Sequence, residues 1–362
     1  MTGMARRGGR TIRPAVPDDW ERIRHLRQTA FNWPGEPSLL VDMWVLEEAG
    51  AILACARLEA DAQWLGGRPV PTGLVSSVAV APAARGRGIA SDLLRGLLRR
   101  ARETGLPRLA LYPSAVKPYR QAGFEIAGVA VTLSVAAAQL PRHADASVDE
   151  MSPDDASAVA GCYDRVARGR NGAIARSQRW WQTRVLPNAT PAPGPPSDVH
   201  GFVVRDGAAI SGYVLYTQAA DGDTPYATTI DCRDLVWETP QAALALFGLL
   251  GSGHPMTTTV SWPGEAVDPA RFVLDEAVHA SAIDPWMARL VDPVAALGEH
   301  GTSPDEPLPS NKELLSRVTK PLLVHLPSSA EARSLPMVLL LRLSYSLQTN
   351  LRDHALSKTG VV

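Results

Sequence analysis

Residues 74–90, LVSSVAVAPAARGRGIA, decide the fold of this chain. The first seven, Leu74 to Val80, form an apolar and β-branched run that predicts a buried strand, and Pro82 ends it. A tight turn of arginine and glycine, Arg85 to Ala90, follows and leads directly into a helical pattern. The stretch therefore predicts a strand, a loop and an amphipathic helix, whose apolar residues have the spacing of one helix face: Ile89, Leu93, Leu94, Leu97, Leu98 and Ala101.

The same alternation of elements continues as far as Phe124. Gly105 and Pro107 form a stop signal for the helix. Residues 108–112, RLALY, predict a second strand, and a short segment then closes with residues 119–124, YRQAGF.

A glycine-rich turn between a strand and a helix is suited to bind phosphate. The first backbone N–H groups of the helix have no internal partner and lie at the positive end of its dipole. Gly86 and Gly88 allow a phosphate to approach the backbone closely, and Arg85 and Arg87 add positive charge. An ordinary solvated loop is the alternative, but the order of strand, loop, long helix and strand favours phosphate.

In this order of elements the stretch resembles the GNAT acyltransferase family. The acyl-CoA signature of that family is Arg/Gln-x-x-Gly-x-Gly/Ala, and Arg85, Gly88 and Ala90 occupy its fixed positions. The resemblance implies that acetyl-CoA is the co-substrate and that Tyr119, in the last motif, protonates the leaving CoA thiolate. The residues that it implies for acetyl-CoA are Val78, Ala79 and Val80 along the pantetheine arm, and Arg85, Gly86, Arg87, Gly88, Ile89 and Ala90 around the pyrophosphate.

The composition is that of an ordinary globular protein of two or three domains. The chain has 362 residues, of which 45% are hydrophobic and 20% are charged, and its net charge is −1. This charge argues against nucleic acid or an anionic membrane as the main partner. Cys55, Cys162 and Cys232 lie too far apart for a disulfide framework or a metal site. We therefore expect a protein without a metal. Because no signal-peptide pattern is visible, we also expect it to be cytoplasmic.

The pattern of elements predicts an α/β fold of two tandem GNAT domains, each a mixed twisted sheet flanked by helices. Residues 1–10 are expected to be a flexible N-terminus. Residues 11–145 form the first domain, in the order β-α-β-β-β-α-β-α-β, with a helix through Ile23 and Leu26 and a last strand at residues 129–135. Residues 146–300 form the second domain, in which residues 149–183 look helical and residues 206–207 form a hairpin turn. This half lacks an Arg-x-x-Gly-x-Ala turn, so only the first domain is expected to hold CoA.

Two such domains in tandem resemble the enhanced intracellular survival (Eis) family of N-acetyltransferases. Further correspondences are Ser114 five residues before Tyr119, residues 211–216, SGYVLY, and residues 287–297, MARLVDPVAAL. The resemblance implies transfer of an acetyl group to an amine of a small molecule, aminoglycoside-like or another cationic amine. A homo-oligomer is a further expectation, and Trp180-Trp181 is expected to pack in the core or between the domains rather than to form a ligand cage.

Residues 301–362 depart from the Eis pattern. Eis-like chains continue into a complete third domain, whose C-terminal carboxylate acts as a base in the active site. Here the remaining residues hold three of the four lysines, Lys312, Lys320 and Lys358, and we expect a truncated or divergent segment. Residues after about 310 are then dispensable for acetyl-CoA binding, unless residues 335–351 form an apolar helix that packs on the second domain.

Acyl transfer to an amine requires a polarised carbonyl group, a neutral amine and a proton for the leaving thiolate. A backbone N–H near Val78 can serve the first need, and Tyr119, a phenol with an ordinary pKa of about 10, can serve the third. Packing against Phe124 is the alternative role of Tyr119. Ser114 is predicted to bond Tyr119 or the cofactor, or to cap the turn after Pro113.

The acceptor side of the site is less well defined by the sequence. Phe31 and Trp33, just after the first predicted helix, are the candidates for contact with the substrate. No general base is assigned, and a water chain to a carboxylate would suffice. The acidic residues expected nearest the acceptor cleft are Asp18, Asp19, Glu36 and Asp42, although solvated surface is the favoured role for each of them.

Two other classes of function stay open. The chain could be a non-catalytic acyl-CoA-binding module that recognises a protein partner. It could also be an acyltransferase of natural-product biosynthesis that takes its acyl group from an acyl-carrier protein or an acylated tRNA. An arginine cluster on the long helix would suit such a donor, although a solvated helix face is the favoured explanation: Arg95, Arg99, Arg100 and Arg102.

Overall fold

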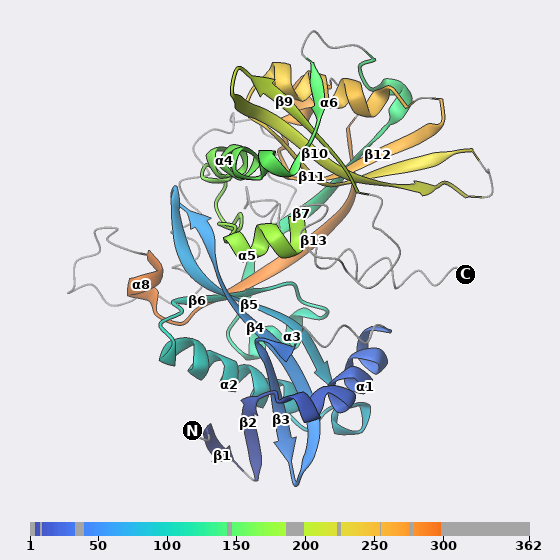
Figure 1. The fold of residues 1–362 in the computed structure, drawn as a ribbon. Coiled ribbons are helices and arrows are strands. Elements are labelled where there is room, and N and C mark those ends of the chain that lie inside the picture. Colours follow the sequence, from blue (N-terminus) through green and yellow to red (C-terminus); the bar gives the residue numbers. More distant parts are fainter. Residues whose placement is uncertain are drawn as a thin grey trace, which may run out of the picture.

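The computed structural model describes residues 4–7, 9–32, 40–142, 147–185, 199–222, 226–253, 255–274 and 278–297. Within these residues the chain forms two lobes that are joined by long strands (Figure 1). All strands of the described residues belong to one mixed sheet of 13 strands, in the order β1-β2-β3-β4-β5-β6-β13-β7-β12-β11-β10-β9-β8. The segment 301–362, predicted to be divergent, lies outside the described residues.

The first half has the element order that the sequence predicted, β-α-β-β-β-α-β-α-β, preceded by one more short strand within residues 1–10. That short strand, β1, pairs antiparallel with β2. The elements are β1 (Met4–Arg7), β2 (Arg10–Pro14), α1 (Trp20–Phe31), β3 (Met43–Glu48), β4 (Ala51–Leu65), β5 (Arg68–Val80), α2 (Ile89–Glu103), β6 (Arg108–Leu111), α3 (Val116–Gln121) and β7 (Glu125–Ala136).

The second half repeats this order. The prediction of helix throughout residues 149–183 is wrong in part, because strand β8 begins the segment and the turn with Gly169 and Gly172 ends α4 at Ala167; Gly172 has a φ of +88°. The elements are β8 (Val148–Glu150), α4 (Ala156–Ala167), α5 (Gln178–Trp180), a π-helical turn (Trp181–Val185), β9 (Val199–Asp206), β10 (Ala209–Ala220), β11 (Thr228–Trp237), α6 (Pro240–Gly251), β12 (Thr257–Gly264), α7 (Ala270–Val273), β13 (His279–Leu290) and α8 (Pro293–Leu297).

Helices cover both faces of the first half of the sheet. The apolar face of α2 is buried as predicted, with Leu93, Leu94 and Leu97 at 1% exposure or less, against strands β3 to β6. On the opposite face α1 buries Ile23 and Leu26 in a separate core. Burial of such apolar surface is the main stabilising contribution in the lobe.

The hairpin of β4 and β5 reaches from the first half to the second. Gly66 and Gly67 both have positive φ, which is the geometry of a tight two-residue hairpin turn. Near the tip, Trp64 N donates to Ala173 O at 2.7 Å and Ala175 N donates to Ala62 O at 2.9 Å. The segment between α4 and α5 is therefore fixed to the first half by backbone hydrogen bonds.

Strands β7 and β13 are exchanged between the two halves of the sheet. The sequence predicted a strand at residues 129–135 and placed it in a compact first unit. Instead, β7 pairs antiparallel with β13 and β12, both from the second half. Conversely, β13 inserts between β6 and β7, with Met287 opposite Leu111. Because one sheet runs through both halves, the division at residues 145 and 146 stays a prediction.

Candidate active site

The arginine–glycine loop joins β5 to α2, and its glycines open the helix N-terminus to ligands. Gly86 and Gly88 have φ values of +78° and +77°, and nothing lies within 4 Å of a Cβ built on either residue. Gly88 is the N-cap of α2, and no side chain caps the first amides of the helix. Unpaired N–H groups at the positive end of the helix dipole can hold an anionic phosphate here.

The two arginines of the loop differ in their contacts. Arg87 donates a hydrogen bond to the carboxylate of Glu48 on β3. Arg10 also supports this flank, because its guanidinium contacts Arg87 O at 3.3 Å and Asp92 Oδ2 at 2.5 Å. Arg85 is exposed, and its side chain has no hydrogen bond or ion pair within the part of the chain that the structure describes. Its guanidinium can therefore contact a phosphate without breaking another bond.

Strands β5 and β6 separate beside this loop. Their parallel pairing joins Gly73 to Leu109 and Leu74 to Ala110 and ends there, although β5 continues to Val80. A bulge at Ser77, whose φ is +55°, also interrupts the pairing of β5 with β4. On the side that faces β6, the backbone of residues 78–80 thus has no strand partner among the described residues. Its peptide groups can bond a ligand that enters between the strands.

Tyr119 lies on the short helix α3 that follows β6. Its side chain is 6% exposed and meets Phe124 edge to face, with 6.3 Å between the ring centroids. A hydrogen bond joins the hydroxyl groups of Ser114 and Tyr119, as the sequence had suggested. Burial raises the pKa of Tyr119, and the bond to Ser114 acts in the opposite direction. The phenol is therefore protonated at neutral pH and can donate a proton.

The acceptor-side residues predicted from the sequence are only partly brought together. Phe31 ends α1 and packs on the core beneath it, whereas Trp33 and Glu36 lie outside the described residues. Asp19 is already engaged, since its carboxylate accepts hydrogen bonds from Arg13 at 2.6 Å and from Val16 N at 2.8 Å. Asp18 is exposed in the turn before α1. Neither aspartate at the start of α1 is therefore a good candidate for the base.

Strand β4 contributes a charged pair that the sequence reasoning missed. Arg57 lies 3.5 Å from Glu59 and 3.7 Å from Asp42, and Asp42 is 3.5 Å from Arg179 on α5. Arg57 and Glu59 share one face of the strand with Cys55, which packs under α1. This group of charges thus connects the sheet face beside α1 with the second half. The only available signal was their alternation with the apolar residues Ala56, Leu58 and Ala60.

In the second half, the strand and helix that correspond to β5 and α2 are β11 and α6, and a shorter loop joins them. β11 leads into α6 through Glu238 and Thr239 alone. Thr239 Oγ1 accepts a hydrogen bond from Ala242 N at 3.2 Å and so caps the helix. The carboxylate of Glu238 pairs with Arg165. A capped N-terminus beside a carboxylate is unsuited to phosphate, which supports the expectation that only the first half holds CoA.

A buried ion pair occupies the sheet face under α4 in the second half. Arg176 Nη1 lies 2.5 Å from Asp234 Oδ2, and Tyr213 Oη donates to the same oxygen at 2.7 Å. The guanidinium lies over the rings of Tyr163 and Trp181, at 3.7 and 4.8 Å from their centroids. Trp181 is thus a core residue, as predicted. The sheet face under α4 thus carries a buried ion pair, whereas the sheet face beside α1 carries the charges of Asp42, Arg57 and Glu59.

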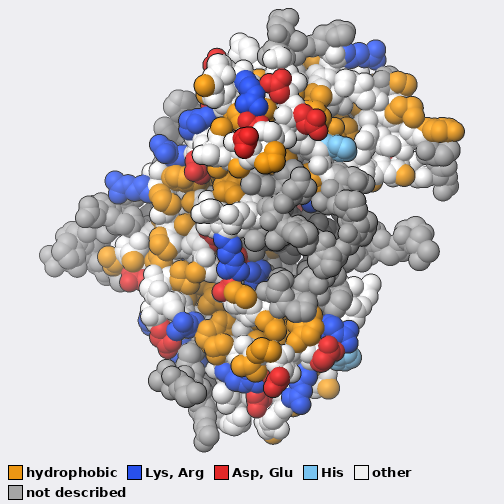
Figure 2. Space-filling model, viewed as in Figure 1, with side chains coloured by type: hydrophobic (Ala, Val, Ile, Leu, Met, Phe, Trp, Pro, Cys, Tyr) orange, Lys and Arg blue, Asp and Glu red, His pale blue; other side chains and the backbone are white. Residues whose placement is uncertain are grey.

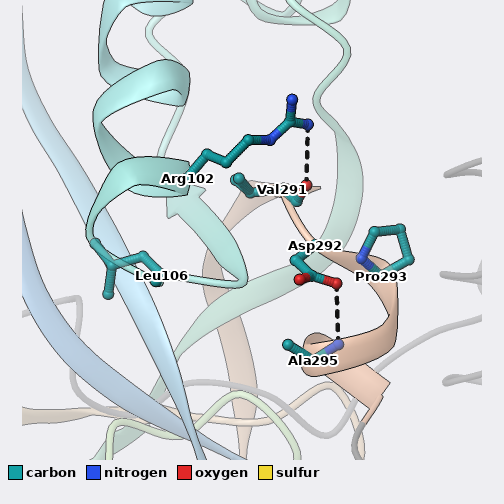
Figure 3. A pocket seen from close by; sticks show the side chains of 7 residues that line it. Arg102, Leu106, Val291, Asp292, Pro293 and Ala295 are labelled. Carbon is teal, nitrogen blue, oxygen red and sulfur yellow. Dashed lines mark hydrogen bonds between the residues drawn. The ribbon is translucent and has the colours of Figure 1, made fainter.

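A cavity of about 300 Å³ lies at the C-terminal end of α2, opposite to the loop (Figure 3). Arg102 donates a hydrogen bond to Val291 O at 3.3 Å there, and Asp292 Oδ1 accepts one from Ala295 N at 3.1 Å. Since α2 is 15 residues long, at 1.5 Å per residue about 20 Å separates this cavity from the loop. It is therefore not part of the candidate site.

Neither acidic nor basic side chains dominate the face of the molecule in Figure 2, in agreement with the net charge of −1. Figure 2 shows acidic and basic side chains interspersed over both lobes. Among the described residues no three His, Cys, Asp or Glu side chains gather as a metal site, and the three cysteines are buried and form no disulfide with one another. None of the helices described is long and apolar enough to cross a membrane.

Two family models match this chain. Residues 11–127 and residues 172–290 each match a model described as an acetyltransferase (GNAT) domain. An uncharacterized N-acetyltransferase of Streptomyces coelicolor is 26% identical over 242 residues, which cover 64% of this chain and 58% of that relative. The chain thus spans less than two thirds of the length of this relative.

Solved structures share the fold. A GCN5-related N-acetyltransferase from Kribbella flavida is 25% identical with a TM-score of 0.66, over 82% of this chain and 74% of that one. A GCN5-related N-acetyltransferase from Anabaena variabilis has a TM-score of 0.70 at 20% identity, over 78% of this chain and 73% of that one. Eis1 from Mycobacterium abscessus has a TM-score of 0.61 at 23% identity, over 78% and 74% of the two chains.

Proposed function

We propose, from the premise that this chain belongs to the GNAT acetyltransferase family and carries two such domains in tandem, that it is an N-acyltransferase. It transfers the acetyl group of acetyl-CoA to an amine of a small molecule, aminoglycoside-like or another cationic amine. One observation carries the proposal: β5 and β6 separate after Leu74 and Ala110, directly beside an open helix N-terminus.

The first domain fits acetyl-CoA in its charge and in its backbone. The amides at the start of α2 and the side chain of Arg85 bind the pyrophosphate, and Gly86 and Gly88 leave room for it. The free peptide groups of residues 78–80 bond the pantetheine arm between the separated strands. The N–H of Val78 polarises the thioester carbonyl.

The reaction then proceeds by direct attack. The neutral amine nitrogen attacks the carbonyl carbon of the thioester, a C–N bond forms, and the C–S bond breaks. Tyr119 gives its phenolic proton to the leaving sulfur, which is possible because burial keeps the phenol protonated. The acceptor nitrogen loses its extra proton to water that leads to a carboxylate.

The acceptor lies on the sheet face beside α1. Asp42 and Glu59 supply negative charge there, and Arg57 holds both carboxylates in place. A cationic amine can replace part of this pairing as it binds, because carboxylates attract an ammonium group at short range. The ion pair between Arg179 and Asp42 brings α5 of the second domain to the edge of this group of charges.

The proposal is tested by incubating the protein with acetyl-CoA and a panel of amines, including aminoglycosides and polyamines. Free thiol is measured together with the mass of each amine, and a gain of one acetyl group with equimolar thiol is expected. Binding of acetyl-CoA without turnover of any amine would instead indicate a non-catalytic binding module. Turnover only with an acyl-carrier protein or acylated tRNA as donor would overturn acetyl-CoA as the co-substrate.

A further inference from the structure

We propose that Arg289 of β13 is a positioning residue for Tyr119, so that the second domain completes the active site of the first through the exchanged strand. This inference rests on the proposed role of Tyr119 as the acid in acyl transfer. Its motivation is a contact between segments that the sequence places 167 residues apart.

Arg289 lies against the turn that ends the helix of Tyr119. Its Nη1 atom donates a hydrogen bond to the carbonyl oxygen of Ala122, the C-cap residue of α3. A Cβ built on Gly123 would lie 2.5 Å from the same Nη1 atom, and Gly123 has a φ of +81°. Only a glycine at this position leaves room for the guanidinium.

The turn is bonded directly to Tyr119. The carbonyl oxygen of Tyr119 accepts hydrogen bonds from Ala122 N and from Phe124 N, both at 3.0 Å. With six residues, α3 is far below the length at which a helix is stable in isolation, about 12 residues. A displacement of the turn at Ala122 and Gly123 therefore moves Tyr119 with it.

The exchanged strand is what brings Arg289 to this place. β13 lies beside β6, where Arg289 is opposite Leu109, and beside β7, where Ala288 is opposite Glu125. Met287, two residues earlier, points to the same face of the sheet and is buried in the core under α2. Arg289 thus enters the first domain from a strand that follows α7 in the chain.

The contribution of Arg289 to the stability of the fold does not explain its presence. It has no carboxylate partner within the described ranges, and its Nε atom is buried without a hydrogen bond. Burial lowers its pKa, and the neighbouring guanidinium of Arg102 adds to this effect. A half-buried charge with one carbonyl partner costs desolvation free energy that an apolar side chain would avoid. The hydrogen bond of Arg289 to the turn explains an arginine here, because an apolar side chain such as methionine could not make it.

Arg289→Met tests the inference, with Arg271→Met of α7 as the matched control. Arg271 also donates to a backbone carbonyl, that of Val278 at 3.0 Å, in the second half of the chain. We expect kcat of Arg289→Met to fall by roughly 10-fold or more, since a misplacement of about 1 Å can cost about 10²-fold. KM for acetyl-CoA should change by less than about twofold. Arg271→Met should keep wild-type kcat, and Arg289→Lys, which retains a donor, should lie between Arg289→Met and wild type.

A double-mutant cycle with Tyr119→Phe separates positioning from a general structural effect. Arg289→Met should lower kcat in the wild-type background and leave it unchanged in the Tyr119→Phe background, because the group that it positions is then absent. An equal loss in both backgrounds, or no loss in the wild-type background, would overturn this inference and leave the proposed function intact. Wild-type kcat in Tyr119→Phe alone would overturn the acid assignment and this inference with it.

Discussion

Leu74 of β5 and Ala110 of β6 form the last pair of two parallel strands that then separate. β5 continues for six residues beyond this pair, through the bulge at Ser77, before the loop and α2 begin. The separation exposes peptide groups in the middle of a sheet, where they would otherwise pair with a neighbouring strand. A ligand that pairs with them and places an anion on α2 is the simplest explanation of this arrangement.

Arg85→Ala should weaken the binding of acetyl-CoA by roughly 10- to 100-fold, which is the worth of one hydrogen bond between charged groups. The side chain of Arg85 has no other bond to lose among the described residues, so the fold should be unaffected. Isothermal titration calorimetry measures the affinity, and Arg99→Ala, on the exposed part of α2, is the control. Equal affinities in Arg85→Ala and the wild type would remove Arg85 from the site.

Tyr119→Phe should lower kcat by roughly 10²- to 10⁴-fold, the usual contribution of a positioned acid. Affinity for acetyl-CoA should hardly change, because the aromatic packing against Phe124 is retained. Ser114→Ala should cause a smaller loss, since it removes one hydrogen bond to the phenol. Steady-state kinetics with a competent amine checks both variants, and turnover of Tyr119→Phe near the wild-type level would leave packing as the role of Tyr119.

Gly123→Ala should lower both stability and kcat. The positive φ of +81° alone costs about 1–2 kcal/mol for a residue with a Cβ, and the new methyl group displaces Arg289. Gly105→Ala is the matched control, because Gly105 has a φ of +71° with nothing within 4 Å. We expect similar backbone strain in both variants, measured by urea unfolding, but a loss of kcat only in Gly123→Ala. Equal kcat values in the two variants would argue against a role of the turn in catalysis.

Asp19→Asn should destabilise the protein by about 1–2 kcal/mol near pH 7, since a charged hydrogen bond is lost. The hydrogen bond from Arg13 holds the pKa of Asp19 below its ordinary value. A lowered pKa in the folded state means that this stability is present above about pH 4 and is lost as the pH falls through the lowered value. Urea unfolding at pH 7 and at pH 3 should show a difference that shrinks in acid. Asp18→Asn, at an exposed neighbour, should show no difference at either pH.

Local sequence patterns predicted most of the elements and part of the site. The apolar spacing of α2 and the glycines before it are determined within a few residues of chain, and the structure confirms the burial of Leu93, Leu94 and Leu97. Tyr119 and Ser114 are likewise close in sequence, and their hydrogen bond follows from one short segment. These features could be predicted because each depends on neighbours within one or two elements.

The features that the sequence did not reveal depend on partners far away in the chain. The exchange of β7 and β13 is a choice between pairing partners with the same apolar alternation, so no periodicity distinguishes them. The buried arginines Arg57 and Arg176 and the half-buried Arg289 cannot be distinguished in the sequence from the many exposed arginines. Only the fold shows which of them meets a carboxylate, a ring or a carbonyl oxygen.

The most direct test of the central claim is a calorimetric titration of acetyl-CoA into the wild type and into Gly88→Val. Valine at a φ of +77° is strained and fills the space in front of the helix N-terminus, while it leaves the core under α2 in place. We predict one acetyl-CoA per chain for the wild type and no measurable binding for Gly88→Val, with both proteins folded by circular dichroism. Unchanged affinity in Gly88→Val, or two equivalents bound by the wild type, would contradict a single CoA site at the loop of the first domain.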